Sequence, residues 1–167
     1  KFKCVYRQYW NDKKNRIYYM KWLGRQLGFR HRNDWYRVSK RDFKNHNGIT
    51  MLEKFYGTCP AKAVADCFPK YEWYPWLFNT IPNQLWDDKK ERLRYLRWLG
   101  EQTGFETSDH WYGITDQHFR QNSGYTILAR YYNGSPQAAV KELFPRKKWY
   151  PWLFAQTPKN YWKKKAN

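Results

Sequence analysis

The 167-residue chain has few cysteines and no long apolar run, and each scarcity excludes a class of protein. Cys4, Cys59 and Cys67 form no CxxC spacing, so neither a disulfide framework nor a cysteine-ligated zinc site is predicted. No run approaches the roughly 18 apolar residues that a membrane-spanning helix needs. We therefore expect no membrane partner and a reducing intracellular compartment, the nucleus or an organelle in preference to the cytosol.

Acidic residues are also scarce, at 14 against 32 lysines and arginines, which leaves a net charge of +18. Residues 9–84 hold 14 basic and 6 acidic residues (+8), and residues 85–160 hold 12 and 8 (+4). A charge this large attracts polyanions, so nucleic acid is the first partner to expect. The aromatic content of 22%, with eleven tryptophans, predicts a packed core and excludes a disordered basic tail.

The sequence aligns with itself without a gap after a shift of 76 residues, with 31 of 76 positions identical. The run WYPWLF occurs at residues 73–78 and again at 149–154. We predict two tandem, rigidly joined units at residues 9–84 and 85–160. Residues 1–8 and 161–167 are expected to be remnants of neighbouring units, because Trp162 follows Trp86 by the same 76 positions.

Each unit is predicted to be all-α, with four to five short helices. In the first unit the expected helix starts, set by capping residues or by proline, are Asn11 or Asp12, Ser39, Thr50 and Pro60. The tryptophans are expected to be core residues rather than ligand platforms, and Trp73, Trp76 and Phe78 to pack against one unit or both. Asp66 and its counterpart Glu142 are expected on the exposed side of the last helix.

Catalysis is not expected, nor is a cofactor, a metal or a small-molecule substrate. No histidine or cysteine recurs at the 76-residue offset, which excludes a metal site or a Cys/His nucleophile shared by both units. No Walker or dinucleotide glycine motif occurs. One alternative stays open, a phosphate enzyme that uses an unmatched acid such as Asp34, Asp42 or Glu72.

Basic positions do recur, and they suggest a phosphate-contacting ridge on the first helix of each unit. Tyr19 and Tyr95 lie beside this ridge in the sequence, where a ring could stack on an exposed base. Residues 30–41 are basic in the first unit, whereas Glu106 and Asp116 stand in the second, so unequal contact is expected. The predicted nucleic-acid-binding residues are Lys13, Lys14, Arg16, Tyr19, Lys21, Arg37, Lys40, Arg41, Lys44, Lys89, Lys90, Arg92, Tyr95, Arg97, Arg120 and Arg130.

The pattern WLGxQxGF, WY, SPxxAV and W–W–F resembles tandem tryptophan-rich repeats of poorly characterised eukaryotic proteins, which implies only that such units occur in arrays. The stretch from Phe43 to Tyr56 also resembles DNA-binding three-helix modules. The predicted function is non-catalytic nucleic-acid binding, with duplex DNA slightly preferred. The alternatives are an RNA-binding component of a ribonucleoprotein particle and a protein-interaction array that docks through WYPWLF. Further copies of the repeat in the same parent chain are also expected as partners.

Overall fold

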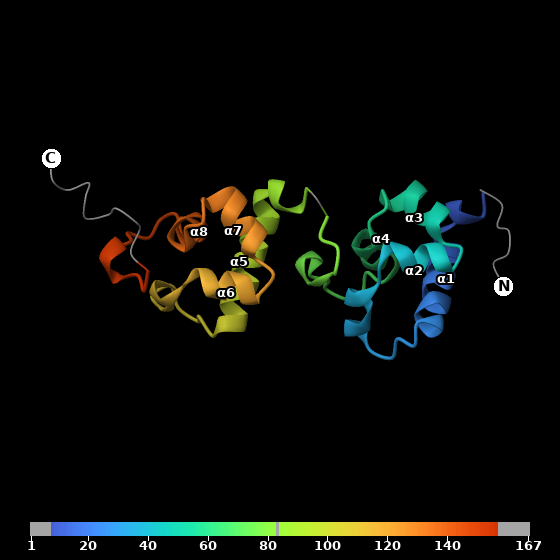
Figure 1. Cartoon of the computed structure of the whole chain (residues 1–167), viewed down its shortest axis with the longest axis horizontal. Helices are drawn as coiled ribbons and strands as arrows, with labels where there is room; N and C mark the ends of the chain where they lie inside the picture. The colour runs from blue at the N-terminus through green and yellow to red at the C-terminus, as the bar shows by residue number, and fades with distance from the viewer. Residues whose placement is uncertain (1–7, 83, 157–167) are drawn as a thin grey trace. The chain divides into compact units, whose positions relative to one another are not determined.

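The computed structural model describes residues 8–82 and 84–156, which form helices and turns without a strand. This confirms the all-α class. The chain divides into two compact units, residues 1–83 and 84–167, each described here by itself (Figure 1). No helix in the described ranges is both long and apolar enough to cross a bilayer. Apart from Gln8, the predicted flanking segments lie outside the described residues.

Both units present the same order of elements (Figure 1). The first contains η1 (Tyr9–Asn11), α1 (Lys13–Gln26), η2 (Arg32–Arg37), α2 (Lys40–Asn45), α3 (Ile49–Tyr56), α4 (Pro60–Cys67) and η3 (Pro75–Leu77). The second contains η4 (Leu85–Asp87), α5 (Lys89–Thr103), η5 (His110–Gly113), α6 (Asp116–Gln121), α7 (Tyr125–Tyr132), α8 (Pro136–Leu143) and η6 (Pro151–Leu153). All α-helices of the second unit begin 76 residues after their counterparts in the first.

The helix starts follow the predicted capping chemistry, with one exception. The Asp12 carboxylate accepts a hydrogen bond from the backbone N–H of Lys14 (2.8 Å), which satisfies one of the free donors at the start of α1. Ser39 and Asp42 form the predicted capping box of α2. The prediction for Thr50 is wrong, because α3 begins at Ile49 with Gly48 as its N-cap and Thr50 lies within the helix.

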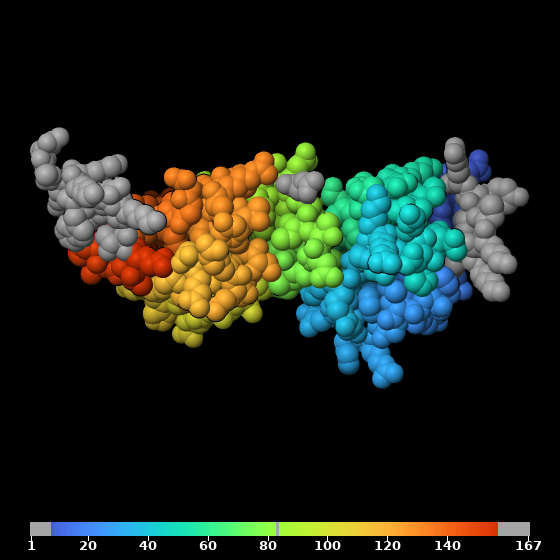
Figure 2. All heavy atoms as spheres, in the orientation of Figure 1, coloured from blue at the N-terminus to red at the C-terminus, as the bar shows by residue number. Residues whose placement is uncertain are grey.

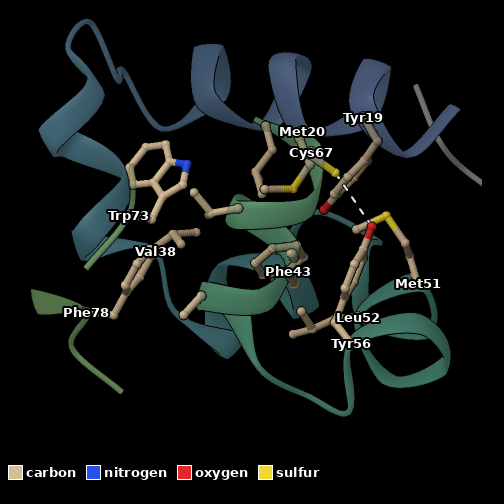
Figure 3. Close-up of a cluster of buried hydrophobic side chains, with 14 of the residues drawn as sticks. Tyr19, Met20, Val38, Phe43, Met51, Leu52, Tyr56, Cys67, Trp73 and Phe78 are labelled. Atoms are coloured by element: carbon tan, nitrogen blue, oxygen red, sulfur yellow. Dashed lines mark hydrogen bonds between the residues drawn. The ribbon is translucent and has the colours of Figure 1, made fainter. Parts of the chain in front are cut away.

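The core of the first unit lies between α1, α3 and α4, with Phe43 of α2 at its centre (Figure 3). Tyr19, Met20 and Leu23 of α1 are fully buried there. Gly48 is needed for this packing, because a Cβ at that position would clash with the Tyr19 hydroxyl group. Gly124 stands in the same relation to Tyr95 in the second unit.

The first WYPWLF segment folds back onto its own unit. The rings of Trp73 and Phe78 pack edge-on against Tyr36, with centroids 5.5 and 4.9 Å away, and Figure 3 shows both beside Val38. The Tyr36 hydroxyl oxygen accepts a hydrogen bond from the backbone N–H of Tyr74 (3.3 Å). The packing predicted for Trp73 and Phe78 is therefore confirmed within the first unit.

The second WYPWLF segment packs in the same way, with Trp149 and Phe154 against Tyr112 at centroid distances of 5.0 and 4.8 Å. The middle tryptophans of the two segments differ. Trp76 is 1% exposed, whereas Trp152 is 51% exposed. A shared sequence therefore does not give the two segments the same exposure.

Candidate nucleic-acid interface

The cations of α1 lie on two different faces of the helix. Residues along an α-helix are about 100° apart, so positions 14 and 21 share a face that positions 13 and 16 do not. Helix α4 packs against α1, and Lys13 pairs with Asp66 of that helix (2.6 Å). Lys14 and Lys21 are exposed and form no ion pair with the described part of the chain. The single ridge expected from the sequence is therefore two separate sets.

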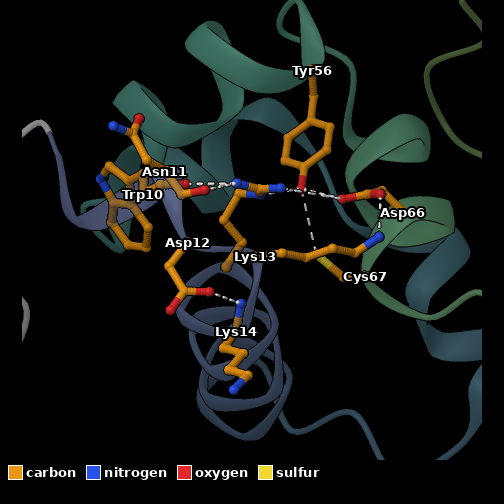
Figure 4. A network of polar contacts seen from close by, with 9 residues as sticks. Trp10, Asn11, Asp12, Lys13, Lys14, Tyr56, Asp66 and Cys67 are labelled. Atoms are coloured by element: carbon orange, nitrogen blue, oxygen red, sulfur yellow. Dashed lines mark hydrogen bonds and ion pairs between the residues drawn. The ribbon is translucent and has the colours of Figure 1, made fainter.

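Arg16 belongs to a partly buried network of polar contacts. Figure 4 shows its partners Trp10, Asn11 and Tyr56. The Arg16 side chain is 12% exposed. Its guanidinium donates to the backbone oxygens of Trp10 (2.7 Å) and Asn11 (3.1 Å) and to the hydroxyl oxygen of Tyr56 (2.9 Å). Tyr56 in turn donates to Asp66 (2.8 Å). The prediction that Arg16 contacts nucleic acid is wrong, because its donors tie α1 to the preceding turn and to α3.

Arg92 has the corresponding structural role in the second unit. Its guanidinium donates to the backbone oxygen of Trp86 (2.8 Å) and to Glu142 (3.0 Å), and its side chain is largely buried. Lys89 lies 3.9 Å from the same carboxylate. The prediction for Arg92 is therefore wrong for the same physical reason as that for Arg16.

The exposed position predicted for Asp66 and Glu142 is wrong, because both acids accept these cations. Asp66 and Glu142 face α1 and α5, and their side chains are 35% and 19% exposed. Burial alone would raise the pKa of Asp66, but hydrogen bonds from Lys13 and Tyr56 and the charge of Arg16 bring this pKa below its ordinary value. Both carboxylates therefore neutralise cations that the sequence assigned to a ligand.

The prediction that Tyr19 and Tyr95 contact nucleic acid is also wrong. Both rings are 0% exposed, and burial raises the pKa of both hydroxyl groups well above the ordinary tyrosine value. The Tyr19 hydroxyl group donates to the backbone oxygen of His46 (3.3 Å), and that of Tyr95 to Asn122 (3.1 Å). Neither ring has a face to offer a base, because each fills the centre of its own unit.

Several other predicted residues lie at the surface next to a carboxylate. These pairs are Arg37 with Asp34 (2.7 Å), Lys40 with Glu53 (3.8 Å), Arg120 with Asp116 (3.3 Å) and Arg130 with Asp87 (3.8 Å). Exposed pairs of this kind contribute little stability and can exchange a carboxylate for a phosphate. The predicted residues that are exposed without an ion pair to the described residues are Lys14, Lys21, Arg41, Lys44, Lys90 and Arg97.

Two of the acids considered for catalysis have structural partners. Asp34 accepts hydrogen bonds from the backbone N–H groups of His31 (2.9 Å) and Arg30 (2.8 Å), which lower its pKa. Asp42 accepts from the backbone and the hydroxyl group of Ser39. In the described ranges, no group of three or more His, Cys, Asp or Glu side chains is placed to hold a metal ion.

The exposed face of α1 carries a row of residues that the predicted set contained only in part. Lys14, Tyr18, Lys21 and Arg25 follow the spacing i, i+4, i+7 and i+11, which places them along one side of the helix. We call this row the α1 stripe. All four side chains are exposed, and Tyr18 is 57% exposed. The helical spacing itself was the signal that could have included Tyr18 and Arg25.

The counterpart row on α5 differs in charge and in chemistry. It consists of Lys90, Arg94, Arg97 and Glu101, so an arginine replaces the tyrosine and an acid replaces the last cation. Arg94 is paired with Glu91 (3.5 Å). The second unit thus presents a weaker positive surface on the same helix face.

A cavity of about 720 Å³ in the second unit lies beside the exposed row of α5, because Arg97 and Glu101 of that row line it. The other lining residues therefore lie next to this row. Arg97, Glu101, Glu106 and Ser108 line the cavity, together with the aromatic rings of Phe105, Trp111 and Phe144. The counterparts of the four polar positions in the first unit are Lys21, Arg25, Arg30 and Arg32. All four are exposed cations without an ion pair among the described residues, and Figure 2 shows side chains projecting from the segment between α1 and α2.

Comparisons with protein-family models, with curated proteins and with solved structures found no match to this chain.

Proposed function

We propose that the chain is a non-catalytic nucleic-acid-binding protein whose first unit presents the phosphate-binding surface. The observation that carries this proposal is the group of exposed cations without an ion pair in the part of the chain described. They are Lys14, Lys21 and Arg25 of the α1 stripe and Arg30 and Arg32 of the following segment. We call these five residues the basic face.

The surroundings of the basic face support a polyanionic ligand. Asp34 lies beside Arg30, but its carboxylate pairs with Arg37 and not with a cation of the basic face. A folded surface with several cations that pair with no carboxylate carries a positive potential. Phosphate groups relieve this potential and release counterions when they bind. The net charge of +18 adds long-range attraction to the same ligand.

The unequal units support a leading role for the first. Residues 9–84 carry +8 and residues 85–160 carry +4. The difference is concentrated where Glu101 and Glu106 replace Arg25 and Arg30. A phosphate backbone that follows both units would therefore be held more tightly by the first.

A salt titration tests the proposal. The full chain is titrated into fluorescein-labelled duplex DNA, duplex RNA and single strands at several salt concentrations, and the dissociation constant is taken from anisotropy. For each phosphate neutralised, log affinity falls against log salt with a slope of about −0.9 for duplex and about −0.7 for single strands, so five contacts give a slope of roughly −4. A slope near zero for every ligand would contradict the proposal.

The exposed Trp152 favours a second candidate function, docking to another copy of the repeat. Trp152 and Leu153 are 51% and 55% exposed, and the Tyr150 ring lies 5.2 Å from that of Trp152. Exposed apolar patches of this kind mark interaction surfaces. Concentration-dependent self-association in sedimentation, lost on Trp152→Ser, would support docking. A monomer at all concentrations would contradict it.

A further inference from the structure

We infer that the cavity of the second unit binds an arginine side chain of a partner peptide, a ligand that the proposed function does not include. The cavity has a volume of about 720 Å³, which suits a ligand-binding site. It is formed by α5, by the segment that follows this helix and by the end of α8. Aromatic rings and carboxylates line it together, and the inference rests on this combination.

Three aromatic rings meet at steep angles in this cavity. The ring of Trp111 lies 5.5 Å from that of Phe105, with an interplanar angle of 66°, and 5.9 Å from that of Phe144, with an angle of 69°. Trp111 is buried, whereas Phe105 and Phe144 are half-buried and keep part of their surface in water. A planar guanidinium stacks on aromatic rings of this kind and gains from cation–π attraction.

Two carboxylates line the cavity without a cationic partner of their own. Glu101 and Glu106 are exposed, and neither forms an ion pair with a described residue. Arg97 also lines the cavity, so its wall carries two negative charges and one positive charge. An ionised carboxylate accepts hydrogen bonds, and the guanidinium of arginine donates two in parallel to it. One further guanidinium would therefore neutralise the wall.

A second hollow of about 590 Å³ continues the cavity and offers room for a peptide backbone. The two hollows share Ser108 and Phe144 in their linings. Lys147 of the second hollow is paired with Asp109 and also donates to Ser108 (2.7 Å). Arg146 adds a second cation there. The ligand's guanidinium therefore belongs in the first hollow, and the chain that carries it extends into the second.

The first unit carries the same rings beside the opposite charge. Phe29, Trp35 and Phe68 stand at the matching positions, and the Trp35 ring lies 5.2 Å from that of Phe29 and 4.9 Å from that of Phe68. Arg25 and Arg30 replace the two glutamates. The rings thus recur with the fold, whereas the carboxylates belong to the second unit alone. The first unit therefore serves as an internal control, because its cations repel an arginine.

The net charge of +18 opposes the approach of a cationic peptide at long range. At an ionic strength of about 0.15 M the Debye length is about 8 Å, so exposed charges farther away act weakly. Under these conditions the carboxylates at the cavity have a larger effect than the distant cations. The test is therefore made at this ionic strength.

An NMR titration of the isotopically labelled full chain tests the inference. The probe is the blocked peptide Gly-Gly-Arg-Gly-Gly, and the control peptide has citrulline, which is neutral and similar in shape, in place of arginine. Backbone amide shifts report both the location of binding and the dissociation constant. Glu101→Gln and Glu106→Gln each remove one carboxylate from the cavity. Glu53→Gln is the matched control, because Glu53 is an acid of the first unit with a side chain that is 52% exposed.

We expect the arginine peptide to shift amides of residues 101–108 and to bind about fivefold or more tightly than the citrulline peptide. Glu101→Gln and Glu106→Gln should each weaken this binding by about threefold or more, and Glu53→Gln by less than about 1.5-fold. Arg97→Gln should strengthen it by about twofold, because a like charge is removed from the wall. Unshifted amides elsewhere in each variant establish that the fold is intact.

Equal binding of the two peptides, or shifts confined to other parts of the chain, overturns the inference. An equal loss from Glu53→Gln or weaker binding by Arg97→Gln does the same. Guanosine monophosphate is titrated separately, and larger shifts of the same amides by this nucleotide than by the arginine peptide would also overturn it. No nucleic acid is present in the peptide titration, so its result is independent of the salt titration that tests the proposed function.

Discussion

The buried side chains of the two units match each other more closely than their exposed side chains do. Arg16 with Asp66 and Arg92 with Glu142 form the same kind of contact at the 76-residue offset, and Tyr19 and Tyr95 are buried alike. Outside, Tyr18 is replaced by Arg94, and Arg25 by Glu101. Recurrence between the units therefore identifies side chains that hold the fold. The candidate binding residues include several that do not recur.

This difference changes how the basic residues are interpreted. A recurrent cation beside a recurrent acid, such as Lys13 with Asp66, stabilises the packing of α1 on α4. A cation that is exposed and not matched by an acid, such as Lys21, is available to a ligand. The following predictions test this division, beginning with the largest effect.

The largest difference in stability between matched substitutions is expected at the middle tryptophans of the WYPWLF segments. Trp76→Ala should lower the free energy of unfolding by about 3–5 kcal/mol, because the whole buried side chain is lost. Trp152→Ala should lower it by about 1–2 kcal/mol, because half of that side chain is in water. Urea denaturation measures both. Equal losses would show that the exposed segment is as important for stability as the buried one.

Removing the buried guanidinium should have nearly the same effect in either unit. Arg16→Met and Arg92→Met should each destabilise the protein by about 3 kcal/mol, because the backbone oxygens that the guanidinium binds before α1 or α5 then lose their donor. Lys14→Met, on the exposed face of the same helix, should change stability by no more than about 0.5 kcal/mol. A larger effect of Lys14→Met would contradict the assignment of the two faces of α1.

Substitution by alanine of the glycine that packs against the buried tyrosine should destabilise both units equally. Gly48→Ala and Gly124→Ala should each cost about 1–3 kcal/mol, because the new Cβ would clash with the hydroxyl group of Tyr19 or Tyr95. Gly113→Ala is the control, since its Cβ would meet only Phe105 at 3.8 Å. Melting temperatures measure the three variants. If Gly113→Ala lowered the melting temperature as much as Gly48→Ala, the clash with the tyrosine hydroxyl group would not be the cause of the loss.

Acid should weaken the inward-facing ion pairs. The pKa of Asp66 in the folded protein is lowered, so its contribution to stability is present above the unfolded value and is lost as the pH falls below about 4. The side chain is 35% exposed, and solvent screening limits the effect to on the order of 1 kcal/mol. Asp66→Asn should therefore lose less stability than the wild type between pH 6 and pH 3. An identical loss would contradict the lowered pKa.

Much of the fold was predictable because it depends on local chemistry. Asp12, Ser39 and Pro60 begin helices as predicted, since capping and proline geometry involve only neighbouring residues. Thr50 was mistaken for a cap because Gly48 can occupy that position without a side-chain bond. Caps that use only the backbone leave no strong signal in the sequence.

The candidate site was less predictable because it depends on which helix face packs inward. Lys13, Lys14 and Arg16 are adjacent in the sequence, and only the packing of α4 on α1 decides which of them is paired with an acid. Tyr18 and Tyr19 are consecutive, yet one is exposed and the other is buried. The spacing of Lys14, Lys21 and Arg25 was visible in the sequence, but the tertiary partner of each residue was not.

The most direct test of the account exchanges charge at matched positions of the two units. Lys14→Glu with Lys21→Glu changes the first unit, and Lys90→Glu with Arg97→Glu makes the same change in net charge at the same positions of the second. We predict that the first variant weakens nucleic-acid binding at least about tenfold more than the second, as measured by anisotropy at one salt concentration. Equal weakening by the two variants, or a greater loss from the second, would contradict the assignment of binding to the first unit.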